Sequence, residues 1–455
     1  MKLAGGVHLT YCSNIHPGES WAEVRANLGR HLLAVRARVA PDAAFGVGLR
    51  LSARAAAELA EPAALAELRA FLARERLYVF TLNGFPYGAF HGTRVKEAVY
   101  LPDWRSAERQ AYTNRLADLL AALLPEGDDD ERALEGSVST VPGAFKPALG
   151  GAADVERIVE HLLQHVAHLV ALQARSGRIV TLALEPEPHC FLETTDEAVS
   201  FFTRTLFAPA AVRRLAALTG LDALAAERAL RRHLGLCLDL CHAAVEFEDA
   251  AAAFDALEAA GIRLLKIQVS AGLRLRSLDA DALAALARFD DAVYLHQVVQ
   301  RAAFVPGMPG MPGMPGMPGM PGTPGTPGTP GAPDAPDAPA APPALTRFAD
   351  LPEAFAALAA ERTEAGAGAH AGTSLPGREW RVHFHVPVFL EALPPFSSTQ
   401  PFLRVALALQ RARPRALHLE VETYTWGLLP AAYRQGSVED AVARELAWTR
   451  AELEA

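Results

Sequence analysis

The sequence predicts an α/β protein built as a (β/α)8 barrel, and three observations favour this fold class. Eight short apolar runs recur along the 455 residues, and amphipathic helical segments separate them. Strict alternation of strands and helices is typical of parallel α/β sheets. Polar residues follow the carboxyl ends of several runs, which is where barrel enzymes place their sites. Hydrophobic residues make up 51% of the chain, so we expect a single barrel domain over residues 1–455.

The expected strands are short apolar runs bounded by turn residues. The first four cover residues 6–12, 45–51, 78–83 and 136–140. The last four cover residues 181–189, 234–242, 263–270 and 416–424. Helix start signals lie between them: Ser20 and Glu23 form a capping box, and Ser52, Asp103 and Thr194 are the expected N-caps of later helices.

An insertion is expected between the seventh and eighth strands. Two further strand-like runs, residues 293–300 and 380–388, predict an excursion or hairpin outside the ring. Between them, residues 306–343 are of low complexity, with nine Gly-X-Pro triplets from Gly307 and then Asp-Ala-Pro repeats. This composition is typical of a solvated, disordered Gly/Pro-rich linker of polyproline-II character, so we expect it to carry no chemistry.

Charge and composition narrow the class of partner. The net charge of −9 argues against a nucleic-acid-binding surface, which needs a basic footprint. Four cysteines are too few for a disulfide framework in a chain of this length, which favours a reducing cytoplasm. Neither a signal peptide nor an apolar run long enough to span a membrane is apparent. We expect a small-molecule metabolite as the partner. The sequence leaves open whether the chain forms a homo-oligomer.

The fifth strand carries the first candidate site residues. The run Thr181–His189 reaches Glu185 and Glu187, which share one strand face. A buried carboxylate is costly unless it meets a cation, a proton or a donor. Other strand ends supply further polar side chains: His8 and Asn14 on the first, Asn83 on the third, Asp239 and His242 on the sixth, Lys266, Gln268 and Ser270 on the seventh, and Glu420 and Glu422 on the eighth.

Three acidic strand ends that face one cavity would repel one another without a cation. An oxygen-rich set suits Mn²⁺, Mg²⁺ or Co²⁺ better than a thiolate-type structural zinc site does. The alternative is structural: Glu185 and Asp239 could be paired with Lys266 or an arginine. Glu420 and Glu422 both share a strand face with His418, so the alternation alone leaves open which of them is the ligand.

The strand ends resemble those of the xylose isomerase-like TIM barrels, which include sugar isomerases, sugar 3-epimerases and relatives of endonuclease IV. The matching motifs are Leu184-Glu185 with Glu193, Asp239-Leu-Cys-His242 and Glu422-Thr-Tyr424. The resemblance implies a divalent metal (Mn²⁺, Mg²⁺, Co²⁺ or Zn²⁺) on Glu185, Asp239 and Glu422. It also implies that Glu185 and Glu422 move the substrate proton, that His242 contacts the substrate, and that Glu422 rather than Glu420 is the ligand.

The seventh strand departs from this pattern. Where the epimerases of that superfamily have a metal-binding His, this chain has Gln268, which could still offer a carbonyl oxygen as a fourth ligand. Alternatively, His383 or His385 could reach the site from the excursion, since both lie on one strand face. The complete set of expected substrate contacts is His8, Asn83, Glu187, His242, Lys266, His383, His385 and Glu420.

Longer segments resemble the EboE family, whose members are called TIM-barrel metabolite traffic proteins of the ebo gene cluster. The matching segments are His8–Trp21, Lys266–Ser270, Tyr294–Gln297, His383–Pro387 and Glu420–Trp426. This resemblance implies a link to the movement of secondary-metabolite precursors, and other proteins of the cluster as partners. Two functions are therefore expected. The preferred one is a metal-dependent isomerase or epimerase-like enzyme, and the alternative is a non-catalytic metabolite carrier that retains the pocket.

Overall fold

Eight parallel strands form the central sheet of the computed structural model, in the order β1-β14-β7-β6-β5-β4-β3-β2. Their bounds are β1 His8–Tyr11, β2 Phe45–Arg50, β3 Leu77–Asn83, β4 Gly136–Thr140, β5 Val180–Leu184, β6 Leu234–Asp239, β7 Arg263–Val269 and β14 His418–Val421. The structure describes residues 1–89, 91–92, 94–125, 135–302, 344–364, 377–434 and 436–455. All eight predicted strands are confirmed, whereas the predicted linker, residues 306–343, lies outside the described residues.

The first and second strands close the ring. Cys12, directly after β1, makes a parallel bridge to Gly48 of β2. The Thr10 hydroxyl adds to this junction: it donates to the Gly46 carbonyl at 2.7 Å and accepts from the Gly48 amide at 3.2 Å. The eight strands therefore form the predicted (β/α)8 barrel, whose carboxyl ends meet at one mouth.

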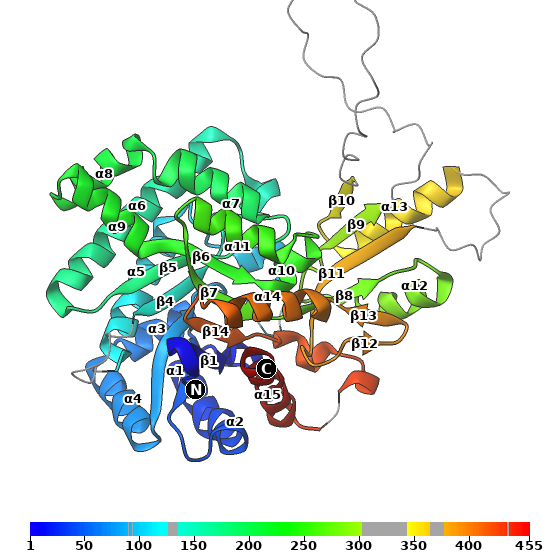
Figure 1. Ribbon diagram of the computed structural model, residues 1–455, viewed down its shortest axis with the longest axis horizontal. Helices are drawn as coiled ribbons and strands as arrows, with labels where there is room; N and C mark the ends of the chain where they lie inside the picture. Colours follow the sequence, from blue (N-terminus) through cyan, green and yellow to red (C-terminus); the bar gives the residue numbers. More distant parts are fainter. Residues whose placement is uncertain (90, 93, 126–134, 303–343, 365–376, 435) are drawn as a thin grey trace, which may run out of the picture.

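Most helices pack around the outside of the barrel, whereas α12 and α13 lie away from it, beside the strands of the insertion (Figure 1). Those up to β6 are α1 Trp21–Asn27, α2 Leu33–Val39, α3 Ala53–Leu59, α4 Pro62–Arg74, α5 Ala107–Leu123, α6 Ala152–Ser176, α7 Thr195–Phe201, α8 Pro209–Thr219 and α9 Ala223–His233. Those after β6 are α10 Leu240–Val245, α11 Ala250–Ala259, α12 Ala280–Leu286, α13 Leu351–Glu364, α14 Gln400–Ala412 and α15 Val438–Glu454. None of the helices in the described ranges is long and apolar enough to cross a membrane.

Most of the predicted helix caps are confirmed. Ser20 forms its capping box with Glu23 at the start of α1, and the side chains of Ser52 and Thr194 cap α3 and α7. Asp103 is not a cap: Ser106 starts α5, and Asp103 instead pairs with Arg105 at 2.7 Å.

The insertion is larger than the predicted hairpin. It contains a six-stranded antiparallel sheet in the order β10-β9-β11-β8-β13-β12. Its strands are β8 Ala271–Leu275, β9 Val298–Ala302, β10 Leu345–Phe348, β11 Arg378–Val386, β12 Ala392–Leu393 and β13 Phe396–Ser398. Figure 1 shows this second sheet beside β7 and β14, at one end of the barrel.

Two features bring the second sheet to the barrel mouth. Only Ser270 separates the end of β7 from the start of β8. Strand β11 pairs with β8 through Val382 and again through Val386, and the register shifts between them. Such irregularities re-aim side chains near functional sites. The bulged segment of β11 carries both His383 and His385, so the excursion reaches back over the strand ends.

Candidate active site

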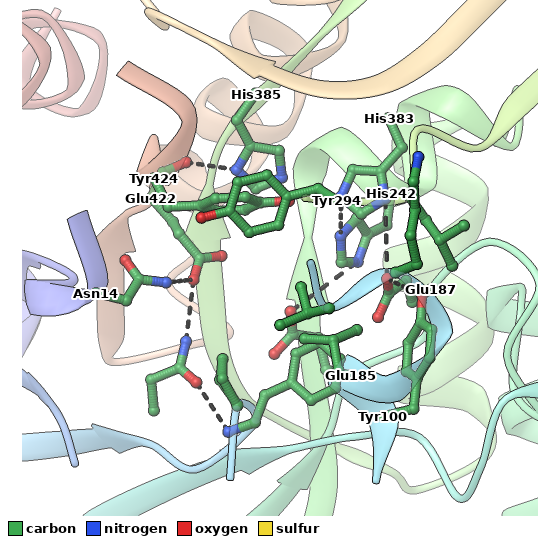
Figure 2. Close-up of a pocket in the computed structure, with 17 residues that line it drawn as sticks. Asn14, Tyr100, Glu185, Glu187, His242, Tyr294, His383, His385, Glu422 and Tyr424 are labelled. Atoms are coloured by element: carbon green, nitrogen blue, oxygen red, sulfur yellow. Dashed lines mark hydrogen bonds and ion pairs between the residues drawn. The ribbon is translucent and has the colours of Figure 1, made fainter. Parts of the chain in front are cut away.

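A cavity at the barrel mouth encloses about 510 Å³ of space, part of it open to solvent. Its polar lining comes from the carboxyl ends of β1, β3, β5, β6 and β14 and from β11 of the second sheet (Figure 2). The polar side chains are Asn14, Asn83, Glu185, Glu187, His242, His383, His385 and Glu422. Parallel strands place their carboxyl ends at one edge, which explains why residues so distant in sequence converge here.

Three carboxylates form the acidic part of the site. Glu185, Asp239 and Glu422 each present an oxygen within 4.8 Å of the other two, and all three side chains are buried. Burial and then the charges of Glu422 and Asp239 raise the pKa of Glu185 well above its usual range. Burial and then the charges of Asp239 and Glu420 do the same to the pKa of Glu422. The cluster therefore favours holding a proton or a cation at neutral pH.

Amide groups fix the orientation of Glu422. Its Oε1 atom accepts from Asn14 Nδ2 at 2.6 Å and from Asn83 Nδ2 at 3.0 Å. Its Oε2 atom accepts from Gln268 Nε2 at 2.6 Å. Figure 2 shows Asn14 and Glu422 facing each other at the side of the cavity. Three donors on one carboxylate hold it in a single rotamer, which suits a group that must meet a substrate atom in a defined place.

Gln268 does not act as the predicted fourth ligand in this arrangement. Its Nε2 atom donates to Glu422, and its Oε1 atom accepts from the Cys237 thiol at 3.1 Å. Both ends of the amide are therefore used within the barrel. The sequence predicts Gln268 as a metal ligand, and the structure places its amide against Glu422 and Cys237, where it holds the Glu422 carboxylate.

Unpartnered oxygens show that the acidic cluster fits a cation. Asp239 accepts on Oδ1 from the Ser270 hydroxyl at 2.6 Å and from the His242 amide at 3.0 Å. Its Oδ2 atom and Oε2 of Glu185 are buried and have no hydrogen-bond partner in the described part of the chain. Buried polar atoms without partners are rare and costly, so a cation or a proton beside these two oxygens would satisfy them.

Three histidines face the acidic cluster. Each Nδ1 atom lies against an oxygen: His242 against the Pro186 carbonyl at 2.9 Å, His383 against Gln297 Oε1 at 2.8 Å, and His385 against the Glu422 carbonyl at 2.8 Å. These acceptors place the ring proton on Nδ1 in each case, so the Nε2 atoms carry the lone pairs. The prediction that histidines from the excursion reach the barrel site agrees with their positions.

Burial keeps the excursion histidines neutral. It lowers the pKa of His385 to about 4. It also lowers the pKa of His383 well below its usual range, and His242 and His385 add to this effect. A neutral imidazole is the form that binds metal ions. Ligand atoms of Asp239, His242 and His385 lie within 4.8 Å of one another, as do those of Glu187, His242 and His383.

Glu187 lies on the far side of the histidines from Glu422. Its Oε1 atom accepts from the Tyr100 hydroxyl at 2.7 Å, and Gln297 Nε2 donates to the same hydroxyl at 2.8 Å. Burial raises the pKa of Glu187. The prediction of Glu187 as a cavity residue agrees with its position, whereas sequence reasoning did not identify Tyr100 as a site residue. Tyr100 lies in the long loop after β3, where no periodic pattern marks it.

Three predicted substrate contacts lie outside the cavity. His8 is the first residue of β1, at the opposite end of the barrel, where its ring contacts Tyr78 at 2.9 Å. Lys266 and Glu420 form an ion pair of 2.5 Å inside the barrel, with both side chains 0% exposed. Alternation along a strand gives the correct face for all three, but only the last residues of a strand reach the mouth. These predictions are corrected.

Apolar side chains form the other wall of the cavity. They come from the loop after β3 and from the segment before β9, and they are Phe85, Pro86, Val95, Val99, Tyr294 and Leu295. Lys96 also lines the cavity, and it is paired with Asp350 at 2.6 Å. One side of the cavity is therefore lined by carboxylates, amides and imidazoles, and the other side is largely apolar. This arrangement suits a small molecule with hydroxyl groups on one side and carbon atoms on the other.

Among the comparisons with known proteins, only the one with solved structures finds matches to this chain. No family model matches the chain, and no curated protein matches it. The probable 3-DHS dehydratase AsbF from Bacillus anthracis is 12% identical over 58% of this chain and 73% of its own, with a TM-score of 0.32. The IOLI protein with a binding zinc atom is 12% identical over 58% and 72%, with a TM-score of 0.33. A D-tagatose 3-epimerase-like protein is 13% identical over 58% and 75%, with a TM-score of 0.34. Similarity at this level leaves the reaction to be argued from the site.

Proposed function

We propose that the chain is a divalent-metal-dependent isomerase or epimerase-like enzyme that acts on a small hydroxylated metabolite. The observation that carries this proposal is the cluster of Glu185, Asp239 and Glu422 at the mouth of a barrel, with ligand oxygens within 4.8 Å of one another. Carboxylates with raised pKa values in one cavity are typical of acid–base sites. The resemblance of the same strand ends to sugar isomerases and epimerases supports the same reaction class.

Asp239 is the residue best suited to hold a metal, since its Oδ2 atom is buried and without a partner among the described residues. Glu185 and Glu422 are the other ligands that the sequence predicts. When bound, the metal polarises a carbonyl–hydroxyl pair of the substrate and makes the adjacent C–H bond more acidic. The amide donors on Glu422 and the Nδ1 contacts of the three histidines hold the site in place before the substrate arrives.

Proton transfer is assigned to the two glutamates. Glu185 has a buried Oε2 atom without a partner in the described ranges, so it can accept a proton from a substrate carbon. Glu422 approaches from another strand, and in its protonated form it can donate a proton to the same carbon from its own side. Glu185 is then protonated and Glu422 ionised, and proton exchange with solvent restores both groups. Burial raises the pKa of both groups in the metal-free site, so each of them holds a proton more readily than an exposed glutamate does.

The two walls of the cavity define the substrate class. Hydroxyl groups of a sugar or similar metabolite would face Glu187, His242 and Asn83, and its carbon atoms would pack against Tyr294 and the other apolar side chains. Lys96 is already paired with Asp350, so the site favours an uncharged substrate over a phosphate or carboxylate. The resemblance to the EboE family adds a role in the movement of secondary-metabolite precursors.

Deuterium incorporation tests this function. The full chain is incubated in heavy water with a panel of neutral ketoses, aldoses and cyclitols, with Mn²⁺ or Co²⁺ and, separately, with a chelator. We expect at least one compound to gain one mass unit at carbon only in the presence of metal. In Glu185→Gln the rate should fall by about 100-fold or more, the usual contribution of a general base. Full turnover by that variant would refute the assignment.

A non-catalytic carrier is the second candidate, and Gln268 favours it. The epimerases that the strand ends resemble have a metal ligand at this position. In this chain the Gln268 amide donates instead to the Glu422 carboxylate at 2.6 Å. A carrier would bind a metabolite without exchanging its carbon-bound protons. Thermal stabilisation by a compound from the same panel, with no deuterium gain at any metal concentration, would therefore support the carrier over the enzyme.

A further inference from the structure

Two imidazole nitrogens meet in the cavity, and the other nitrogen of each ring faces an oxygen that accepts a proton. His242 Nε2 and His383 Nε2 are 3.1 Å apart. The proton of His242 lies on Nδ1, which faces the Pro186 carbonyl, and the proton of His383 lies on Nδ1, which faces Gln297. Two lone pairs at this distance repel each other unless a cation lies near both of them.

The orientation of Gln297 supports this proton count. Its Nε2 atom contacts the Tyr100 hydroxyl at 2.8 Å and the Pro188 carbonyl at 3.3 Å. A carbonyl oxygen only accepts, so the nitrogen of the amide must face it. The Oε1 atom of Gln297 therefore faces His383 and accepts its Nδ1 proton. The tautomer of His383 thus follows from the side-chain contacts rather than from an arbitrary assignment.

More acceptors surround the same point. His385 Nε2 and Asp239 Oδ2 are buried, and neither has a hydrogen-bond partner in the part of the chain that the structure describes. The ligand atoms of Asp239, His242 and His385 all lie within 4.8 Å of one another. One proton can satisfy one pair of acceptors, but it cannot satisfy three imidazoles and a carboxylate. A metal ion bound by Asp239, His242 and His385 would satisfy three of them at once and would place a cation beside His383.

We propose that the metal of this chain is held on nitrogen, by His242, His385 and Asp239 with His383 facing His242, and not by the three carboxylates. This inference shares with the proposed function only the need for a cation beside Asp239. Two imidazoles and one carboxylate select Zn²⁺, Co²⁺ or Ni²⁺ over Mg²⁺ and Mn²⁺. The Nδ1 contacts of the three histidines are the outer-shell bonds that normally orient metal-binding imidazoles.

The proposal also gives Glu185 and Glu422 a single task. If the metal lies on the histidine side of Asp239, neither glutamate is committed as its ligand, so both carboxylates are free to exchange protons. Gln268 then no longer replaces a lost ligand. Its bond to Glu422 orients an acid–base group, and the second sheet supplies through β11 the ligand that β7 does not.

X-ray absorption on the wild-type protein tests the ligand set directly. The full chain is depleted of metal, loaded with one equivalent of Co²⁺ or Zn²⁺, and measured at the metal edge. We expect the multiple-scattering pattern of at least two imidazoles. A shell of oxygen ligands without imidazole would overturn the inference, and it would leave the proposed enzyme intact with its metal on the carboxylates. No variant is needed, so a folding defect cannot obscure the result.

Matched variants give a second measurement by Co²⁺ titration followed through visible absorption. His385→Gln and His242→Gln should each weaken Co²⁺ binding by about 100-fold or more, since loss of even an outer-shell partner costs about 10–100-fold. Glu185→Gln should change it only a few-fold. His168→Gln is the control, because His168 lies on α6 and pairs with Asp118 at 2.9 Å. Loss of binding in Glu185→Gln with retention in His385→Gln would overturn the inference.

Discussion

Gln268 donates from Nε2 to Oε2 of Glu422 across 2.6 Å, and the two side chains stand on the neighbouring strands β7 and β14. The other end of the amide accepts from Cys237 on β6 at 3.1 Å. Gln268 thus links three adjacent strands beneath the cavity, and it turns the Glu422 carboxylate toward Asn14 and Asn83.

Replacing Gln268 with histidine should create a better oxygen-and-nitrogen site at the carboxylates. An imidazole at this position removes the donor from Glu422 Oε2 and adds a ligand to Glu185, Asp239 and Glu422. We expect the affinity for Mn²⁺, measured by calorimetry, to rise about tenfold or more. Gln173→His on the outer helix α6 is the control, and an unchanged Mn²⁺ affinity in Gln268→His would contradict the prediction.

The buried pair of Lys266 and Glu420 should behave as a unit. Lys266→Met leaves the Glu420 carboxylate buried without its cation, and removal of one partner of a buried pair costs about 3–5 kcal/mol. Replacing both residues, as Lys266→Met with Glu420→Leu, should recover most of that loss. Urea unfolding of the full chain measures both. Arg54→Met, at a pair with Glu58 that is 69% and 39% exposed, should cost less than about 1 kcal/mol.

Glu445 should make stability depend on pH. This buried residue of α15 accepts from Thr423 Oγ1 at 2.6 Å and from the Val388 amide at 3.1 Å, and burial raises its pKa to about 7. An unfolded glutamate has a pKa of about 4.3. The folded chain therefore takes up the proton first as pH falls. The cost of ionising Glu445 is absent below about pH 4 and complete above about pH 7.

The matching experiment compares Glu445→Gln with the wild type at pH 5 and pH 8. Each unit of raised pKa corresponds to about 1.4 kcal/mol. The free energy of unfolding of Glu445→Gln, relative to that of the wild type, should therefore rise by about 2–3 kcal/mol from pH 5 to pH 8. Chemical unfolding measures it. Glu67→Gln, at a carboxylate that is 61% exposed, should show no such trend. A pH-independent difference for Glu445→Gln would refute the assignment.

Gly48 should tolerate no side chain. A Cβ atom at this position would collide with Oε1 of Glu420 and would lie 2.6 Å from the backbone oxygen of Tyr11. Gly48 also makes the bridge to Cys12 that closes the barrel. Gly48→Ala should destabilise the fold by about 3 kcal/mol, the upper part of the range for overpacked cores. Gly88→Ala, where a Cβ would meet nothing within 4 Å, is the control; equal melting temperatures would contradict this prediction.

The barrel could be predicted from the sequence because its strands are continuous apolar runs. Strand β5, for example, is fully buried over Val180–Leu184, and burial on both faces leaves a clear signal in the residues. Strands β10 and β12 gave no such signal: β10 is largely half-exposed and β12 has two residues. Their pairing depends on partners distant in sequence, so the second sheet was predicted only as a hairpin.

The sequence predicted on which face of each strand the site residues lie, but not how far along the barrel axis each of them lies from the mouth. Alternation places Lys266 and Gln268 on one face, and likewise Glu420 and Glu422, yet only Glu422 reaches the cavity. Depth depends on the stagger between strands, such as the pairing of His418 with Lys266. His8 fails for the same reason, because it begins its strand. Tyr100 lies in a loop whose path no local pattern encodes.

The single residue between β7 and β8 determines how the two sheets can move. Ser270 accepts from the Cys241 amide at 3.0 Å and donates to Asp239 at 2.6 Å. A hinge needs a few residues that can change their backbone angles, and this junction offers one, tied at its side chain to β6. The second sheet therefore cannot swing away at this point without pulling on Asp239. A second tie lies in the loop after β3, where Lys96 pairs with Asp350 of the insertion at 2.6 Å, so a displacement of the insertion would strain two contacts at the mouth of the barrel.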